Sequence, residues 1–248
     1  MNAVPTVGFS HFLAQTDAVG STILFLLLIM SVTTWYLVAV KAWNAFLTRR
    51  RTQRFLERFW DSPSLNAVAS YLDKQPADEP FSNLTQQAIL ATRHHQRHGA
   101  NKLNESGSTT EFLSRSMRRV IDEETARFES GLTVLASIGS TAPFLGLFGT
   151  VWGVYHALVA IGMSGQGTLD KVAGPVGEAL IMTALGLAVA IPAVLAYNFA
   201  VRRNRLVLSQ LDSFAHDLFA FLTTGAHVSE PLASPAPMQH QPAARGAA

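Results

Sequence analysis

Cysteine is absent from the 248 residues, and charged residues make up only 15% of them. Without cysteine the chain has no disulfide, no thiolate nucleophile and no thiolate metal ligand. Soluble domains usually carry about 25% charge, whereas here 48% of the residues are hydrophobic. The formal net charge of +2 is too small to indicate binding to nucleic acid. The composition therefore favours a membrane protein.

The sequence also lacks the short motifs that mark common enzyme sites. It contains no G-x-S-x-G, no H-E-x-x-H and no phosphate-binding glycine loop. His94 and His98 are four residues apart, with His95 beside them, and such a pair can bind a metal. No carboxylate accompanies them at catalytic spacing, so a solvated basic face is the better interpretation. We expect no enzyme activity, no metal and no cofactor.

Three runs of the chain contain no Asp, Glu, Lys or Arg, namely residues 18–40, 130–169 and 179–201. Each is long enough to cross the hydrocarbon core, which takes about 20 residues of helix. Basic residues follow the first run at Lys41 and the third at Arg202. By the positive-inside rule these basic ends are cytoplasmic, so the N-terminus is outside and the C-terminus inside.

The expected fold is an all-α, polytopic membrane protein with three transmembrane helices, the second and third long and extending into the cytoplasm. The region between the first and second spans holds most of the charge and is too polar for a sizeable globular core. We expect one unbroken helix from about Glu111 to about Ile161, because no breaker is evident there. The expected segments are an external N-terminal segment (1–17), transmembrane helix 1 (18–40), a cytoplasmic helical region (41–130), transmembrane helix 2 (131–163), an external turn (164–168), transmembrane helix 3 (169–201), a cytoplasmic helix (202–224) and a disordered tail (225–248).

Small residues form stripes on the second and third expected spans. At 100° per residue, one arc of the second span holds Gly139, Pro143, Gly146 and Thr150, and the adjacent stripe holds Gly149, Gly153 and His156. The third span aligns Ala179, Thr183, Gly186 and Ala190. Small residues let membrane helices approach closely, so these stripes predict helix packing. We expect the glycine stripe of the second span to form contacts between subunits, with His156 as a hydrogen-bonded residue on it.

Thr150 and Thr183 have two interpretations. A threonine in a membrane helix often bonds only to its own backbone, but its hydroxyl can also line a hydrophilic path. Counting from a turn near Gly165, both lie roughly 22–27 Å along their helices, at matching depth. This match favours a path that the two hydroxyls line together.

Glu178 is the only acid of the apolar region beyond the turn that holds Asp170 and Lys171. If the third helix begins at Pro175, Glu178 lies in its first turn and is stabilised by the helix dipole. If it begins near Thr168, Glu178 lies roughly 15 Å inside, where an acid is a candidate for function. On an ideal helix Glu178 and Thr183 are about 140° apart, so one narrow path does not include both without a kink.

Two segments carry a resemblance to a known family, GSTAPFLGLFGTVWG at 139–153 and GEALIMTALGLAVAIPAVLAYN at 177–198. With the three-span order, they resemble the MotA/TolQ/ExbB proton channel family over about a third of the chain. At GPVGE (174–178) many members read APGIAE, so the sequence departs from the family next to Glu178.

The resemblance implies a homo-oligomer, a pentamer in the bacterial inner membrane, whose pore holds the transmembrane helices of an ExbD-like dimer. Proton flow would energise TonB, which drives import of iron–siderophore complexes and cobalamin. The family's polar pore residues correspond to Thr150, Glu178 and Thr183, and the essential aspartate is expected on the ExbD-like partner.

Within the family, STAP before the motif and the longer N-terminal segment favour the ExbB branch. The TolQ branch, whose members serve the Tol–Pal envelope complex, is the alternative. A MotA-like stator would have a different number of spans. From another class, a passive scaffold without conduction remains open, and loss of proton flux on substitution of Thr150 would exclude it.

Overall fold

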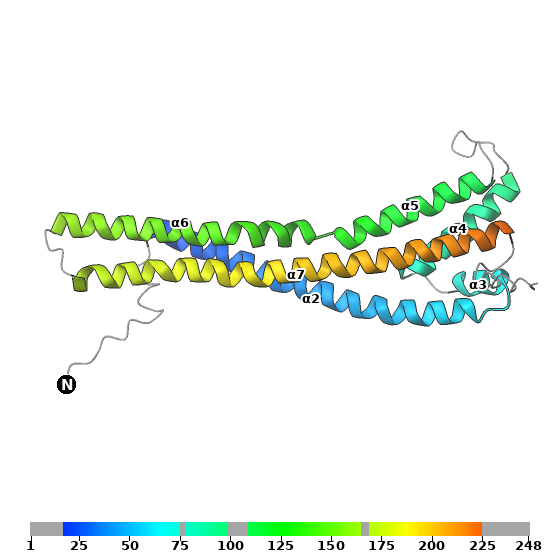
Figure 1. Cartoon of the computed structure of the whole chain (residues 1–248), viewed down its shortest axis with the longest axis horizontal. Coiled ribbons are helices and arrows are strands. Elements are labelled where there is room, and N and C mark those ends of the chain that lie inside the picture. The colour runs from blue at the N-terminus through cyan, green and yellow to red at the C-terminus, as the bar shows by residue number, and fades with distance from the viewer. Residues whose placement is uncertain (1–16, 75–77, 99–108, 165–168, 225–248) are drawn as a thin grey trace, which may run out of the picture.

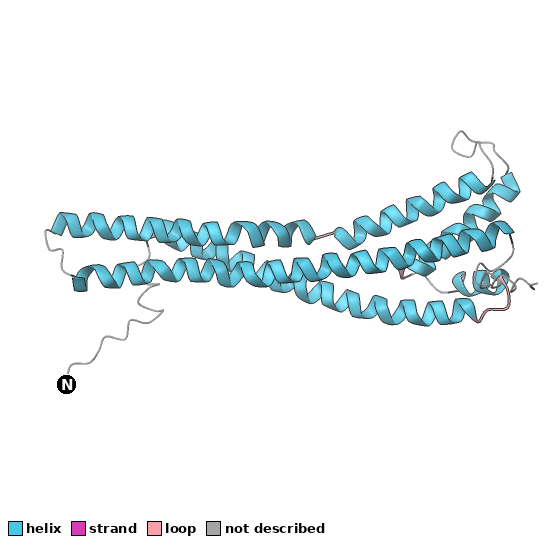
Figure 2. Cartoon of the chain, in the orientation of Figure 1, coloured by secondary structure: helices cyan, strands magenta, loops and turns pink. Residues whose placement is uncertain are grey.

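The computed structural model describes residues 17–74, 78–98, 109–164 and 169–224, and every element in these ranges is a helix (Figure 2). In chain order the helices are α2 (Ala18–Trp60), α3 (Leu65–Leu72), α4 (Pro80–His98), α5 (Thr109–Glu129), α6 (Leu132–Ser164) and α7 (Leu169–Thr224). The molecule is elongated, with α2, α7 and the α5–α6 pair along its length and the short helices at one end (Figure 1). We call that end the cluster end and the end where α6 meets α7 the turn end.

Three helices are long and apolar enough to cross a membrane, as the fold prediction required. Asp17 starts α2 as its N-cap, because its carboxylate accepts a hydrogen bond from the Gly20 amide at 2.8 Å. With 43 residues α2 measures roughly 65 Å, and α7, with 56 residues, roughly 84 Å. A bilayer core is about 30 Å thick, so both helices continue far beyond it.

The three apolar segments pack together around a narrow core. Its buried side chains come from α2, α6 and α7 and are Ile23, Leu27, Leu132, Leu135, Ile138, Ala142, Met182, Val189, Ala190 and Ala193. Most of the contact is between the antiparallel helices α6 and α7, and α2 crosses this pair (Figure 1). The opposite faces stay apolar and exposed, as at Phe144 and Phe199. This pattern suits helices that meet lipid or other protein chains rather than water.

The prediction of one unbroken helix from Glu111 to Ile161 is wrong. α5 ends at Glu129 and α6 begins at Leu132, with Gly131 at a φ of 77° between them. This left-handed conformation suits glycine, which has no Cβ to clash. The Phe128 carbonyl accepts hydrogen bonds from the side chains of Lys41 at 2.8 Å and Asn204 at 2.9 Å. We call this site the 131 joint, because α2 and α7 both hold it.

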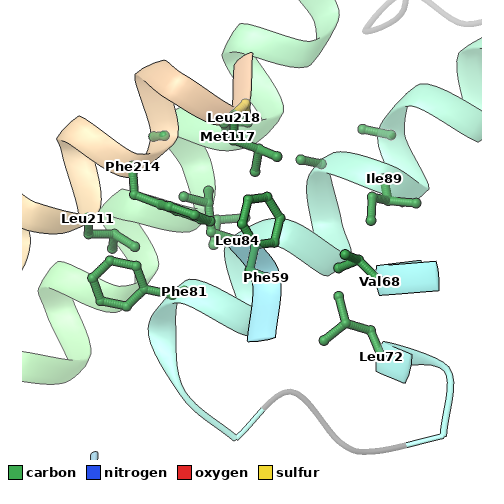
Figure 3. Close-up of a cluster of buried hydrophobic side chains, with 14 of the residues drawn as sticks. Phe59, Val68, Leu72, Phe81, Leu84, Ile89, Met117, Leu211, Phe214 and Leu218 are labelled. Atoms are coloured by element: carbon green, nitrogen blue, oxygen red, sulfur yellow. The ribbon is translucent and has the colours of Figure 1, made fainter. Parts of the chain in front are cut away.

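The expectation that residues 41–130 form no sizeable core is also wrong. At the cluster end, α3, α4 and α5 pack with the ends of α2 and α7 around one apolar cluster (Figure 3). Phe214 of α7 lies at its centre, with ring centroids 5.1 Å from Phe59 and 5.4 Å from Phe81. The sequence analysis missed this cluster because α4 and α5 are amphipathic, so their many charges conceal one apolar face each.

Candidate functional site

Four glycines of α6, at positions 139, 146, 149 and 153, face α7 of the same chain. A Cβ built on Gly146 would lie 2.7 Å from the Met182 carbonyl oxygen, and one on Gly186 would lie 2.7 Å from that of Ala142. No real side chain fits so close to backbone, so the two helices touch through glycine. The prediction that this stripe forms contacts between subunits is therefore wrong, because α7 already covers it.

Three further glycines of α6 lie on the same seam, whereas Pro143 does not lie at its closest point. A Cβ on Gly139 would lie 2.5 Å from Val194, one on Gly149 3.2 Å from Met182, and one on Gly153 3.1 Å from Ala179. Pro143 is half-buried inside α6, next to Ala142, and it is Ala142 whose side chain is completely enclosed.

The close approach brings two hydroxyls together. Oγ1 of Thr150 and Oγ1 of Thr183 are in direct contact across the seam. Thr150 Oγ1 also lies 3.1 Å from the Gly146 carbonyl oxygen and 3.1 Å from that of Ala179, while Thr183 Oγ1 is 3.5 Å from the Gly146 oxygen. Both side chains are half-buried.

The geometry gives this hydroxyl pair more acceptors than protons. Each threonine has one O–H to donate and two lone pairs to accept with. Two hydroxyl protons are thus shared among two carbonyl oxygens, Gly146 O and Ala179 O, and the two hydroxyl oxygens themselves. Either hydroxyl can rotate and still find an acceptor. The two hydroxyls can therefore exchange donor and acceptor roles, so that hydrogen bonds connect the backbone of α6 with that of α7 in more than one arrangement.

Glu178 belongs to α7, and its side chain lies outside what the structure describes. Because α7 begins at Leu169, the interpretation in which the helix starts at Pro175 is wrong. Glu178 is nine residues into the helix, about 14 Å along its axis. It directly precedes Ala179, whose carbonyl meets Thr150. The external turn expected near Gly165 lies outside the described residues.

A second polar group lies towards the turn end of α6, away from the glycine seam. The Trp152 indole donates a hydrogen bond of 2.6 Å to the Asp17 carboxylate. His156 is exposed, with Nδ1 at 3.1 Å from the Trp152 carbonyl oxygen and its ring 4.5 Å from the indole. The prediction that His156 lies on the seam is therefore wrong. Hydrogen bonds from the Gly20 amide and then the Trp152 indole hold the pKa of Asp17 below its ordinary value.

Sequence reasoning missed this tie between Asp17 and Trp152 and also the 131 joint. Asp17 was recognisable, since an aspartate just before an apolar helical run is a common N-cap. Gly131 was recognisable too, because a glycine at the change from a charged to an apolar helix often marks a helix end. The partners of these residues lie far away in sequence, and no local pattern identifies them. In the histidine group that the sequence offered as a metal pair, His94 is exposed, and the side chains of His95 and His98 lie outside what the structure describes.

Comparison with known proteins gives a consistent result. The model of the MotA/TolQ/ExbB proton channel family matches residues 77–213. A biopolymer transport protein ExbB from Xanthomonas campestris pv. campestris is 42% identical over 234 residues, covering 91% of this chain and 92% of that protein. An ExbB from Neisseria meningitidis is 44% identical over 202 residues, covering 82% and 91%. A Tol-Pal system protein TolQ from Pseudomonas aeruginosa is 30% identical over 229 residues, covering 92% and 98%.

The match to the family model covers more than half of the chain, and it includes both sides of the glycine seam and the hydroxyl pair. The three apolar helices agree with a membrane channel or transport subunit. This chain belongs to the MotA/TolQ/ExbB proton channel family.

Proposed function

We propose that this chain is the ExbB-type subunit of an inner-membrane complex that couples proton flow to TonB. TonB would use that energy to import iron–siderophore complexes and cobalamin at the outer membrane. The single observation that carries the proposal is the Thr150–Thr183 hydroxyl pair, which spans a glycine seam within three membrane-crossing helices. A passive scaffold has no need of two hydroxyls in contact at that position.

The proton path comprises Glu178, Thr150 and Thr183. Glu178 takes up a proton from the turn end, which is the periplasmic end in this proposal. A glutamate within a membrane-spanning helix is by default a candidate for function, and its carboxyl group can hold a proton and release it to a nearby acceptor. The hydroxyl pair orients the acceptor, and an acid on the ExbD-like partner receives the proton. In this proposal the N-terminus lies in the periplasm and the C-terminus in the cytoplasm, an orientation that the basic residues after the first and third apolar runs support.

The exposed apolar faces of α6 and α7 support the partners that we propose. Phe144 is 71% exposed on α6 and Phe199 is 70% exposed on α7, so the helix pair has apolar surface on both sides of its seam. Five copies arranged in a ring would cover part of this surface and enclose a pore for the helices of an ExbD-like dimer. Lipid would cover the remainder.

The experiment is deletion of the gene followed by growth on an iron–siderophore complex as the only iron source. We expect the deletion to prevent growth, wild type to restore it and free iron salts to bypass the defect. A Thr150→Val variant should restore growth poorly at equal membrane abundance. Normal siderophore-dependent growth of the deletion strain would contradict the proposal.

A TolQ-type role in the Tol–Pal complex is the second candidate, favoured by the 30% identity to a TolQ along almost the whole chain. The same deletion strain distinguishes the two. An ExbB-type chain leaves the outer-membrane barrier intact, whereas a TolQ-type chain is expected to maintain it. Sensitivity of the deletion strain to large antibiotics, with normal siderophore uptake, would favour TolQ.

A further inference from the structure

Three cations line the contact between α2 and α7 just beyond the apolar run 18–40. Lys41, Ala45 and Arg49 are spaced by four residues on α2, so they share one face. Arg203 of α7 reaches this face and donates a hydrogen bond to the Ala45 carbonyl oxygen. Arg49 lies near enough to repel Arg203 electrostatically. Lys41 and the exposed Arg49 lie about two turns apart on one face of α2, with the Arg203 contact at Ala45 between them, and we call these three cations the α2–α7 cation column.

No carboxylate of the described residues forms an ion pair with any member of this column. Lys41 and Arg203 are half-buried, and their hydrogen bonds go to the carbonyl oxygens of Phe128 and Ala45. Placing like charges side by side with partial loss of water is unfavourable. An anion between the two guanidinium groups would remove the repulsion, and a phosphate accepts hydrogen bonds from two arginines well.

The residues around the cation column are of the types that commonly surround a bound lipid headgroup. Leu28, Trp35, Ala42 and Arg49 recur every seven residues on α2, so they fall on nearly one face of the helix. Leu28 and Trp35 are 60% and 62% exposed, which leaves an apolar strip leading from the span to Arg49. Trp43, 67% exposed, lies at the same level as the cations. Tryptophan and basic residues together are typical of the membrane–water interface.

We propose that Arg49 and Arg203 bind the headgroup phosphate of an anionic phospholipid at the junction of α2 and α7. Its acyl chains would lie along the strip formed by Leu28 and Trp35. The lipid phosphate would supply the negative charge that no described carboxylate supplies to these cations. It would also lie next to the 131 joint, because Lys41 belongs to both.

Lipid binding to the purified full-length chain in detergent tests this proposal. Native mass spectrometry would measure binding of phosphatidylglycerol and of phosphatidylcholine at equal concentrations. We expect tighter binding of phosphatidylglycerol, and an Arg49→Gln variant should weaken it about five-fold, the effect of one basic residue near an anionic surface. Arg203→Gln should weaken it at least as much. If Arg203→Gln fails to fold, because it loses the bond to Ala45, Arg49→Gln still carries the test.

Arg205→Gln is the matched control, since Arg205 is on the same helix at almost the same level but about 200° around from Arg203. It should change phosphatidylglycerol binding less than two-fold, by about the uncertainty of the measurement. Equal loss in Arg49→Gln and Arg205→Gln would mean a diffuse basic surface and overturn the site. So would equal binding of the two lipids. Displacement of the lipid by millimolar inorganic phosphate would indicate a site for free phosphate. A changed oligomeric mass in Arg49→Gln would indicate that Arg49 contacts another copy of the chain. Either result would overturn the proposal of a lipid site.

Discussion

At the scale of single residues, the hydroxyl pair is the feature with the clearest chemical consequence. Thr150 and Thr183 touch each other and share backbone acceptors across two helices. Valine has the shape of threonine without the hydroxyl. We expect Thr150→Val and Thr183→Val each to reduce siderophore uptake about five-fold, corresponding to one lost hydrogen bond of about 1 kcal/mol. Uptake of a radioactive iron–siderophore complex at equal membrane abundance is the measurement.

Thr141→Val is the control for these variants. Thr141 lies on the exposed side of α6, and its hydroxyl donates only to the Ser137 carbonyl of its own helix. Its uptake should equal that of wild type. The double variant Thr150→Val/Thr183→Val should be little worse than either single one, because the two hydroxyls act as a pair. If the loss of uptake in the double variant equals the product of the two single losses, the hydroxyls act independently and not as a pair.

Gly146 permits a separate test of the seam on which the pair depends. A Cβ there meets the Met182 carbonyl oxygen at 2.7 Å, and backbone has little freedom to move away. Gly146→Ala should therefore destabilise the chain by about 1–3 kcal/mol, the usual cost of overpacking. Thermal unfolding in detergent measures this effect.

Gly162→Ala is the matched substitution, because a Cβ at Gly162 meets nothing within 4 Å and the residue is exposed in the same helix. Alanine favours helix over glycine by up to about 1 kcal/mol. This variant should be as stable as wild type or slightly more so. Equal destabilisation of both variants would mean that close packing is not the cause.

At the scale of helices, the 131 joint has a conformational requirement. Gly131 has a φ of 77°, where a residue with a Cβ pays about 1–2 kcal/mol. Asparagine tolerates this conformation better than other residues. Gly131→Val should therefore lower the melting temperature, and Gly131→Asn should lower it less. If both lower it equally, steric contact with Leu37, 3.3 Å from a built Cβ, is the cause and not the backbone conformation.

The helices also show how much of this molecule its sequence could predict. The three apolar runs predicted the spanning helices, because hydrophobic length alone decides whether a helix can cross a bilayer. The matched depth of Thr150 and Thr183 predicted two hydroxyls that line one path; the structure brings the hydroxyls into contact, and the path itself stays a prediction. The side chains that hold the break at Gly131 and the partner of the glycine stripe were not predictable in this way. Both depend on which helix lies alongside: Lys41 and Asn204 are 87 and 76 residues from Phe128 in sequence, and α6 meets the glycine stripe's partner only because α7 folds back on it.

At the scale of the whole molecule, the cluster end contains a buried acid that makes its stability depend on pH. Glu79 is 5% exposed, and its carboxylate accepts hydrogen bonds from Thr52 at 2.8 Å and the Ser82 amide at 2.5 Å. Burial nevertheless outweighs these bonds and raises the pKa of Glu79. The folded chain thus binds this proton more tightly than the unfolded chain. Its contribution to stability is complete below the ordinary glutamate pKa of about 4.3 and is lost as pH rises through the raised value.

Glu79→Gln isolates this contribution, because glutamine keeps an acceptor oxygen but does not titrate. The stability of wild type relative to Glu79→Gln should fall as pH rises above about 4.3. Thermal unfolding in detergent at a series of pH values measures it. Glu123→Gln, at an exposed ion pair with Arg119, should show no such trend. A relative stability that rises with pH would mean that the hydrogen bonds to Glu79 outweigh its burial.

The central claim is that the assembled chain conducts protons through a path that includes Glu178. The most direct measurement is proton flux into liposomes that contain the complex purified with its ExbD-like partner, under an imposed potential. We expect flux for wild type, reduced flux for Glu178→Asp, which keeps a titratable group, and no flux above empty liposomes for Glu178→Gln. Native mass spectrometry must show that all three assemble equally. Wild-type flux through an intact Glu178→Gln complex would contradict the account.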